Sequence, residues 1–122
     1  MAAPNILGAT SIYGKTIGVE LNTTTTSGIL TCAAEKVLKI KSIIVCNIDG
    51  GSSADVTASF YDSSKTVTSP IASTMTVPAD SALVILDTNA PIYLEESDEI
   101  RAGASANADL QMVIGYEELD DA

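Results

Sequence analysis

Residues 37–48, VLKIKSIIVCNI, form the stretch that decides the fold. Apolar residues recur there at alternate positions, as expected of a β-strand with one buried face. From Ile43 to Val45 both alternating sets are apolar, which predicts that the strand passes from a half-exposed position into a covered centre. We therefore expect the main core strand here, with these residues on one face: Leu38, Ile40, Ile44, Cys46 and Ile48.

Weaker strand patterns lie on both sides of this segment. Turns rich in Gly, Pro, Asp and Ser separate them, and Pro70 and Pro78 place their strands at a sheet edge. Eight to nine strands at this close spacing predict an all-β chain that folds as an antiparallel, jelly-roll-like β-sandwich. The flanking strand candidates are residues 11–21, 28–33, 55–61, 82–86, 92–94, 100–104 and 108–119, with 66–69 and 71–77 as a weaker pair around Pro70.

The length of the chain fits one domain. We expect an extended N-terminal arm at residues 1–9, a single β-sandwich domain at residues 10–119 and a short acidic tail at residues 120–122. Residues 1–5 have neither the basic nor the apolar region of a secretory signal, so no signal peptide is expected.

The two cysteines are not expected to pair. If residues 34 and 35 turn a hairpin, Cys32 lies opposite Val37 or Leu38 and far from Cys46. Two buried free thiols are then favoured over a disulfide, which fits synthesis in a reducing cytoplasm.

Charge and composition exclude several classes of function. Sixteen acidic residues against six basic ones give a net charge of −10, which disfavours nucleic acid and anionic membranes as partners. The charge fits either a soluble surface or docking on a basic partner. The chain has no histidine and no tryptophan, so it lacks the usual proton-transfer residue and metal ligand.

Few patterns in the sequence indicate catalysis or metal binding. Acidic side chains gather at residues 95–99 and 117–121, but a glycosidase needs two carboxylates across a cleft with aromatic side chains nearby. A solvated turn and a disordered tail are the default interpretation. Residues 49–51 lack the spacing of a calcium loop, and two separated cysteines cannot hold zinc. We expect no enzymatic activity, no cofactor and no metal.

The surface then becomes the candidate for function. Lys39 and Lys41 share one face of the long strand. Lysines at such positions protect an exposed sheet edge from unwanted pairing. Alternatively, they form salt bridges with Glu95 and Glu96, or with the acidic tail, of a neighbouring subunit.

Three stretches of the chain resemble small virion structural proteins of tailed bacteriophages. They are residues 3–16 (APNIL…SIYGKT), residues 36–50 (KVLKIKSIIVCNIDG) and residues 92–119 (IYLEESDEIRAGAS…VIGYEEL). The resemblance covers nearly the whole chain and consists of strand and turn patterns without a catalytic signature. It implies a compact β-sandwich made in the infected bacterium and built into the particle.

Within that group we favour a capsid decoration (cement) protein, although no capsid-binding motif matches residue by residue. These proteins typically clamp neighbouring major capsid subunits, often as homotrimers, and reinforce the head. The resemblance implies the major capsid protein as partner, with Pro4, Asn5, Ile6 and Leu7 as a clamping arm. A tail, neck or fibre-associated subunit is the alternative. A sugar-binding receptor module is a third possibility, and the low aromatic content argues against it.

Overall fold

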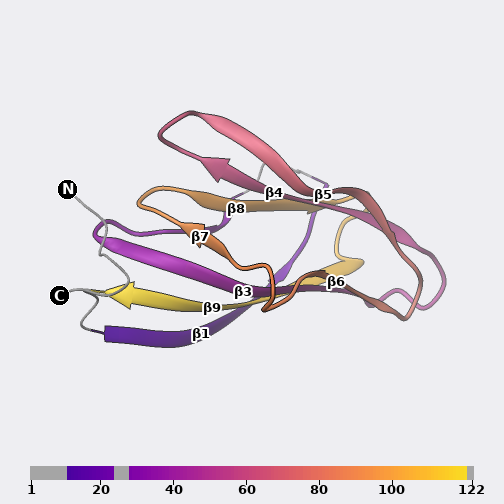
Figure 1. The fold of residues 1–122 in the computed structure, drawn as a ribbon. Coiled ribbons are helices and arrows are strands. Elements are labelled where there is room, and N and C mark those ends of the chain that lie inside the picture. Colours follow the sequence, from indigo (N-terminus) through magenta and orange to yellow (C-terminus); the bar gives the residue numbers. More distant parts are fainter. Residues whose placement is uncertain (1–10, 24–27, 121–122) are drawn as a thin grey trace.

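The computed structural model describes residues 11–23 and 28–120, which form nine strands and no helix (Figure 1). The strands build two antiparallel sheets that face each other, so the predicted β-sandwich is confirmed. Sheet A contains β1 (Ser11–Glu20), β9 (Leu110–Asp120), β3 (Lys36–Asn47), β6 (Ala82–Leu86) and β7 (Ile92–Leu94). Sheet B contains β2 (Gly28–Thr31), β8 (Glu99–Ala104), β4 (Ala54–Asp62) and β5 (Val67–Val77).

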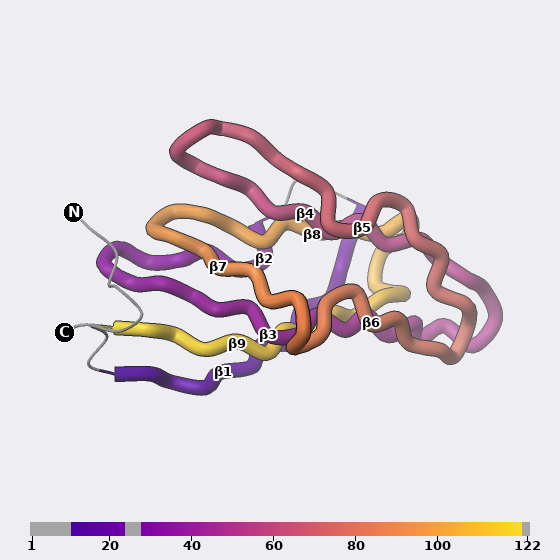
Figure 2. The backbone as a smooth tube through the Cα atoms, viewed as in Figure 1, coloured from indigo at the N-terminus to yellow at the C-terminus, as the bar shows by residue number. Residues whose placement is uncertain are grey.

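The order of the strands is that of a jelly roll. Sheet A runs β1-β9-β3-β6 and sheet B runs β2-β8-β4-β5. β6 and β7 both pair with β3, one along each half of it, so they act as a single strand interrupted by residues 87–91. The tube in Figure 2 shows the chain crossing repeatedly from one sheet to the other. Each crossing places strands that are distant in sequence side by side.

The core lies between the sheets and is almost wholly aliphatic. On β9 the alternate residues Leu110, Met112, Ile114 and Tyr116 are all buried. From sheet B, β4 and β8 contribute small residues such as Ala58 and Ala102, which allow the two sheets to approach closely.

The hairpin expected at residues 34–35 is wrong. β2 pairs with β8 in sheet B, whereas β3 lies in sheet A, so the intervening residues carry the chain between the sheets. Glu35 adopts a left-handed backbone conformation (φ 65°) at this crossing. The hairpin argument against a Cys32–Cys46 bridge therefore fails, but both cysteines are free in the structure.

β3 is central, as predicted, but its side chains do not alternate without interruption. A bulge between Ile40 and Ser42 shifts the register with β9. Leu38 and Ile40 therefore point into the core before the bulge, and Ile43 and Val45 do so after it. The expectation that Ile44, Cys46 and Ile48 share the core face is wrong, because all three are exposed.

The edge position of residues 66–77 is confirmed, although they form one strand and not two. β5 pairs only with β4 within its sheet, and the register shifts beside Pro70 and Ala72. Proline has no N–H to donate to a ladder, so its presence here suits an outer strand.

Candidate functional surfaces

A buried carboxylate organises one end of the sandwich. Asp98 is 5% exposed, and its Oδ1 accepts a hydrogen bond from the backbone N–H of Ser63 (3.0 Å) while Oδ2 accepts one from the N–H of Glu95 (3.1 Å). Its backbone carbonyl accepts the N–H of Cys32, whose own carbonyl accepts the N–H of Ser97. Three turns are thereby joined: β2–β3, β4–β5 and β7–β8.

A buried amide has the same role at the opposite end. Asn47 is 1% exposed, and its Nδ2 donates to the backbone carbonyls of Ser52 (2.9 Å) and Val77 (3.0 Å). Its Oδ1 accepts the N–H of Asp49 at 2.9 Å, and its own N–H donates to the carbonyl of Ser81. Asn47 therefore links the β3–β4 loop to the end of β5 and the start of β6. The expectations drawn from the sequence included neither hub.

Edge protection by Lys39 and Lys41 is wrong, because β3 lies inside sheet A with β9 on one side and β6 and β7 on the other. Lys41 Nζ lies 3.8 Å from Glu117 Oε2 on β9. Lys39 is aligned with Tyr93 on β7 and Glu117 on β9. Their contact with a neighbouring subunit stays a prediction.

The C-terminal acidic run is mostly strand and not a disordered tail. Glu117, Glu118 and Asp120 belong to β9. Glu118 Oε2 lies 3.2 Å from Lys15 Nζ and 3.3 Å from Lys36 Nζ, and Lys36 also lies 3.4 Å from Asp120 Oδ2. The hydrogen bonds to Glu118 and Asp120 raise the pKa of the Lys36 ammonium group. These acidic side chains therefore form ion pairs with lysines of their own chain.

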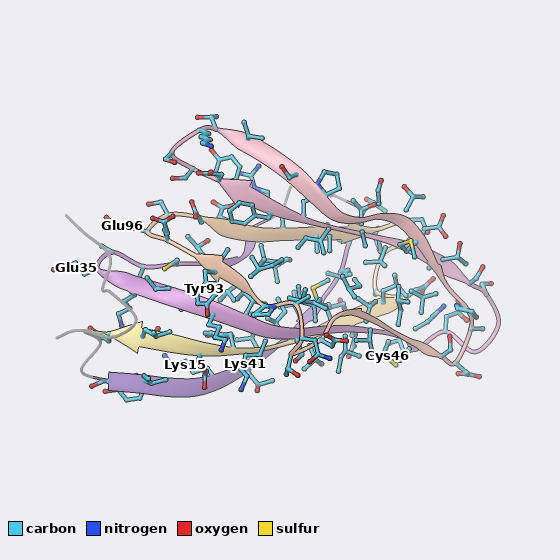
Figure 3. All side chains as sticks on the ribbon, in the orientation of Figure 1. Lys15, Glu35, Lys41, Cys46, Tyr93 and Glu96 are labelled. Atoms are coloured by element: carbon cyan, nitrogen blue, oxygen red, sulfur yellow. The ribbon has the colours of Figure 1, made fainter. Side chains whose placement is uncertain are left out.

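The other expected contact residues are not assembled into one site. Glu95 is exposed and Glu96 half-buried in the turn before β8, where Figure 3 labels Glu96. Neither forms an ion pair within the described part of the chain. The expected arm residues 4–7 lie outside the described residues.

The outer face of sheet B is polar, and its side chains form hydrogen bonds with one another. The guanidinium of Arg101 lies over the ring of Tyr61, with Cζ 3.7 Å from the ring centroid. Arg101 Nε donates to Glu99 Oε1 at 2.9 Å, and Nη1 lies 3.4 Å from Thr68 Oγ1. Both the charge and the flat face of this arginine, the single one in the chain, are therefore occupied.

The outer face of sheet A carries an exposed apolar row. Val84 on β6, Ile44 on β3 and Val113 on β9 are direct cross-strand neighbours, and Gly18 continues the row on β1. The three side chains are 59%, 37% and 43% exposed, and a Cβ added at Gly18 would meet no atom within 4 Å. This apolar row was not anticipated from the sequence.

The two cysteines differ in environment. Cys32 is buried, its Sγ lies 3.2 Å from the carbonyl oxygen of Lys36, and burial raises the pKa of its thiol to about 11. Cys46 is exposed on the outer face of sheet A, beside the apolar row (Figure 3). The prediction of two buried thiols is therefore right for Cys32 and wrong for Cys46.

Within the described ranges, no three His, Cys, Asp or Glu side chains come together in a way that could hold a metal ion. The same residues contain no helix that could cross a membrane.

The fold is similar to that of a chain in the acidic stable capsid structure of Helicobacter pylori bacteriophage KHP30. The TM-score is 0.53 and the sequence identity 8%, so the similarity concerns the fold alone. The match covers 93% of this chain and 91% of that chain, which means that the two chains are nearly equal in length. No protein-family model matches the sequence, and no curated protein matches it.

Proposed function

We propose that this chain is a non-enzymatic virion structural protein, and more specifically a capsid decoration protein that binds the outer surface of the major capsid lattice and stabilises the head. The observation that carries the proposal is the fold similarity to a chain of a bacteriophage capsid structure over nearly the full length of both chains. The extent of the match matters, because it includes both sheets of the sandwich and not a single sheet or hairpin.

The side chains support a role in binding over one in catalysis. The chain has no histidine, and its one arginine is engaged by Tyr61 and Glu99 on the face of sheet B. Two of the buried polar side chains of the described residues, Asn47 and Asp98, join loops through hydrogen bonds. What remains for a partner is a set of exposed strands and an apolar row.

The copy number of the protein in purified virions tests the proposal. Quantitative mass spectrometry should find a fixed ratio to the major capsid protein, because a decoration protein repeats with the lattice. A few copies per particle would instead assign the chain to the tail, the neck or a fibre. Absence from purified virions would refute a structural role in the particle.

The proposed arm is tested separately. Deleting residues 1–9 should reduce retention of the protein on purified heads, since an arm that becomes ordered on the capsid gains main-chain hydrogen bonds there. The full-length chain is the control, and circular dichroism of the free proteins checks that the deletion leaves the sandwich folded. Full retention of the shortened chain would remove the arm from the proposal.

A further inference from the structure

Exposed apolar residues are unevenly divided between the two sheets. Of the large hydrophobic side chains that are exposed in the described residues, sheet B carries only Val67 and Met75, both on its edge strand β5. The rest lie on sheet A or directly after β3. They are Ile12, Tyr13, Ile44, Ile48, Val84, Tyr93 and Val113.

The sequence around the apolar row has the pattern of a sheet that is covered on both faces. Each of its three residues is the middle of three consecutive apolar residues: 43–45 on β3, 83–85 on β6 and 112–114 on β9. Continuous apolar runs of this kind are typical of strands that are buried on both sides. The described fold packs sheet B against one side only and leaves the middle residues exposed.

We propose that the apolar row Val84–Ile44–Val113 on the outer face of sheet A is the surface that docks on the capsid shell. This inference rests on the proposed function and assigns its partner surface. The occupant is a flat apolar strip of the major capsid protein without a strong charge. The row suits such a strip, since the rows directly beside it carry Gln111, Cys46, Ala82, Thr16, Gly115 and Ser42, with Glu20 as their one charged residue.

A second copy of the chain is a poorer occupant for two reasons. At about 100 Å² for a fully exposed aliphatic side chain, the row offers roughly 140 Å², whereas a stable protein interface buries about 800 Å² per partner. A second copy also repeats the net charge of −10, so two copies repel each other, and Lys41, next to Ser42 at the bulge, already lies 3.8 Å from Glu117 Oε2 of its own chain. A shell lattice offers each copy further contacts, including those proposed for residues 1–9, and need not carry the same charge.

Matched lysine substitutions on the two sheets test the surface. The double variant Val84→Lys and Val113→Lys places two ammonium groups in the apolar row. The control variant Val67→Lys and Met75→Lys makes the same change of charge at similarly exposed positions of β5. Binding to phage heads assembled without the protein is measured by co-sedimentation. We expect affinity to fall by at least about tenfold for the sheet A variant and to stay near that of the natural chain for the control.

Labelling of Cys46 in the natural chain gives a second measurement, which does not depend on whether the lysine variants fold. Cys46 is exposed beside the row, while Cys32 is buried and has a thiol pKa of about 11, so a maleimide should react with Cys46 alone. A Cys46→Ser variant should remain unlabelled. On heads, labelling of the natural chain should slow in proportion to the fraction bound.

The outcomes separate the two proposals. Normal binding by the sheet A variant, or equal labelling of Cys46 in free and bound protein, overturns the docking surface and leaves the decoration role standing. Failure of the natural chain to bind heads overturns both. Protection of Cys46 that rises with protein concentration in the absence of heads overturns the shell as occupant and assigns the row to a second copy.

Discussion

Replacing Asp98 by alanine should destabilise the sandwich more than any other single change to an acidic side chain. The carboxylate holds the backbone N–H groups of Ser63 and Glu95 at 3.0 and 3.1 Å, and it does so while only 5% exposed. Alanine leaves both donors in a partly buried place without their acceptor.

The magnitude follows from those two bonds. A hydrogen bond to a charged group contributes about 1.5–3 kcal/mol, and water can partly replace the acceptor at a partly buried donor. We therefore expect Asp98→Ala to lower the free energy of unfolding by about 3 kcal/mol. Asp98→Asn keeps one acceptor oxygen but turns an N–H₂ group toward the second donor, so about half of this loss is expected.

Urea unfolding followed by circular dichroism measures the change. Asp87→Ala is the matched control: Asp87 is exposed and its Oδ1 accepts the N–H of Asn89 at 2.9 Å in a local turn. Removing it should cost about 0.5 kcal/mol or less. Equal losses for Asp98→Ala and Asp87→Ala would refute the role of Asp98 as a hub that joins three turns.

Three further predictions concern other residues. Asn47→Ala removes three hydrogen bonds of a buried amide and should lower the free energy of unfolding by about 3 kcal/mol in the same urea assay. Folding raises the pKa of the Cys32 thiol from 9.0 to about 11, so the folded chain favours the neutral thiol. The contribution of this thiol to the free energy of unfolding is fully present below pH 9 and is lost as the pH rises to about 11. Between pH 8 and pH 11 the free energy of unfolding, measured with urea, should therefore fall by about 2 kcal/mol more for the natural chain than for Cys32→Ala. Replacing Lys39 and Lys41 by serine should reduce the mass of the predicted homotrimer in multi-angle light scattering.

Each of these predictions has an outcome that contradicts it. A change below about 0.5 kcal/mol for Asn47→Ala would mean that loop positions do not depend on its amide. Parallel pH profiles for the natural chain and Cys32→Ala would contradict the buried thiol. An unchanged mass for the lysine variant would remove Lys39 and Lys41 from the subunit contact.

The strands were predictable because their signal is local. Alternation along residues 110–116 of β9 identifies its buried face without any knowledge of the partner strands. The bulge in β3 has no such signal, since Lys41 and Ser42 are ordinary strand residues. It lies opposite the interruption between β6 and β7, which is some fifty residues away along the chain, so only the pairing reveals it.

The candidate surfaces depend still more on distant parts of the chain. Asp98 stands in an acidic run that predicts a solvated turn, and its burial arises only because the turns at residues 32–35 and 62–66 meet it. The apolar row had a signal in the consecutive apolar residues of three strands. At residues 43–45 the run predicts a covered strand, but a sequence does not tell which face of a sheet is covered by the same chain.

The proposed decoration role and docking surface can both be checked by locating the protein on purified virions. Cryo-electron microscopy would compare virions with particles that lack the gene for this chain. We expect difference density that repeats over the outer surface of the head lattice, with a β-sandwich that turns the outer face of sheet A toward the shell. Difference density confined to the tail or neck, or none at all, would contradict it.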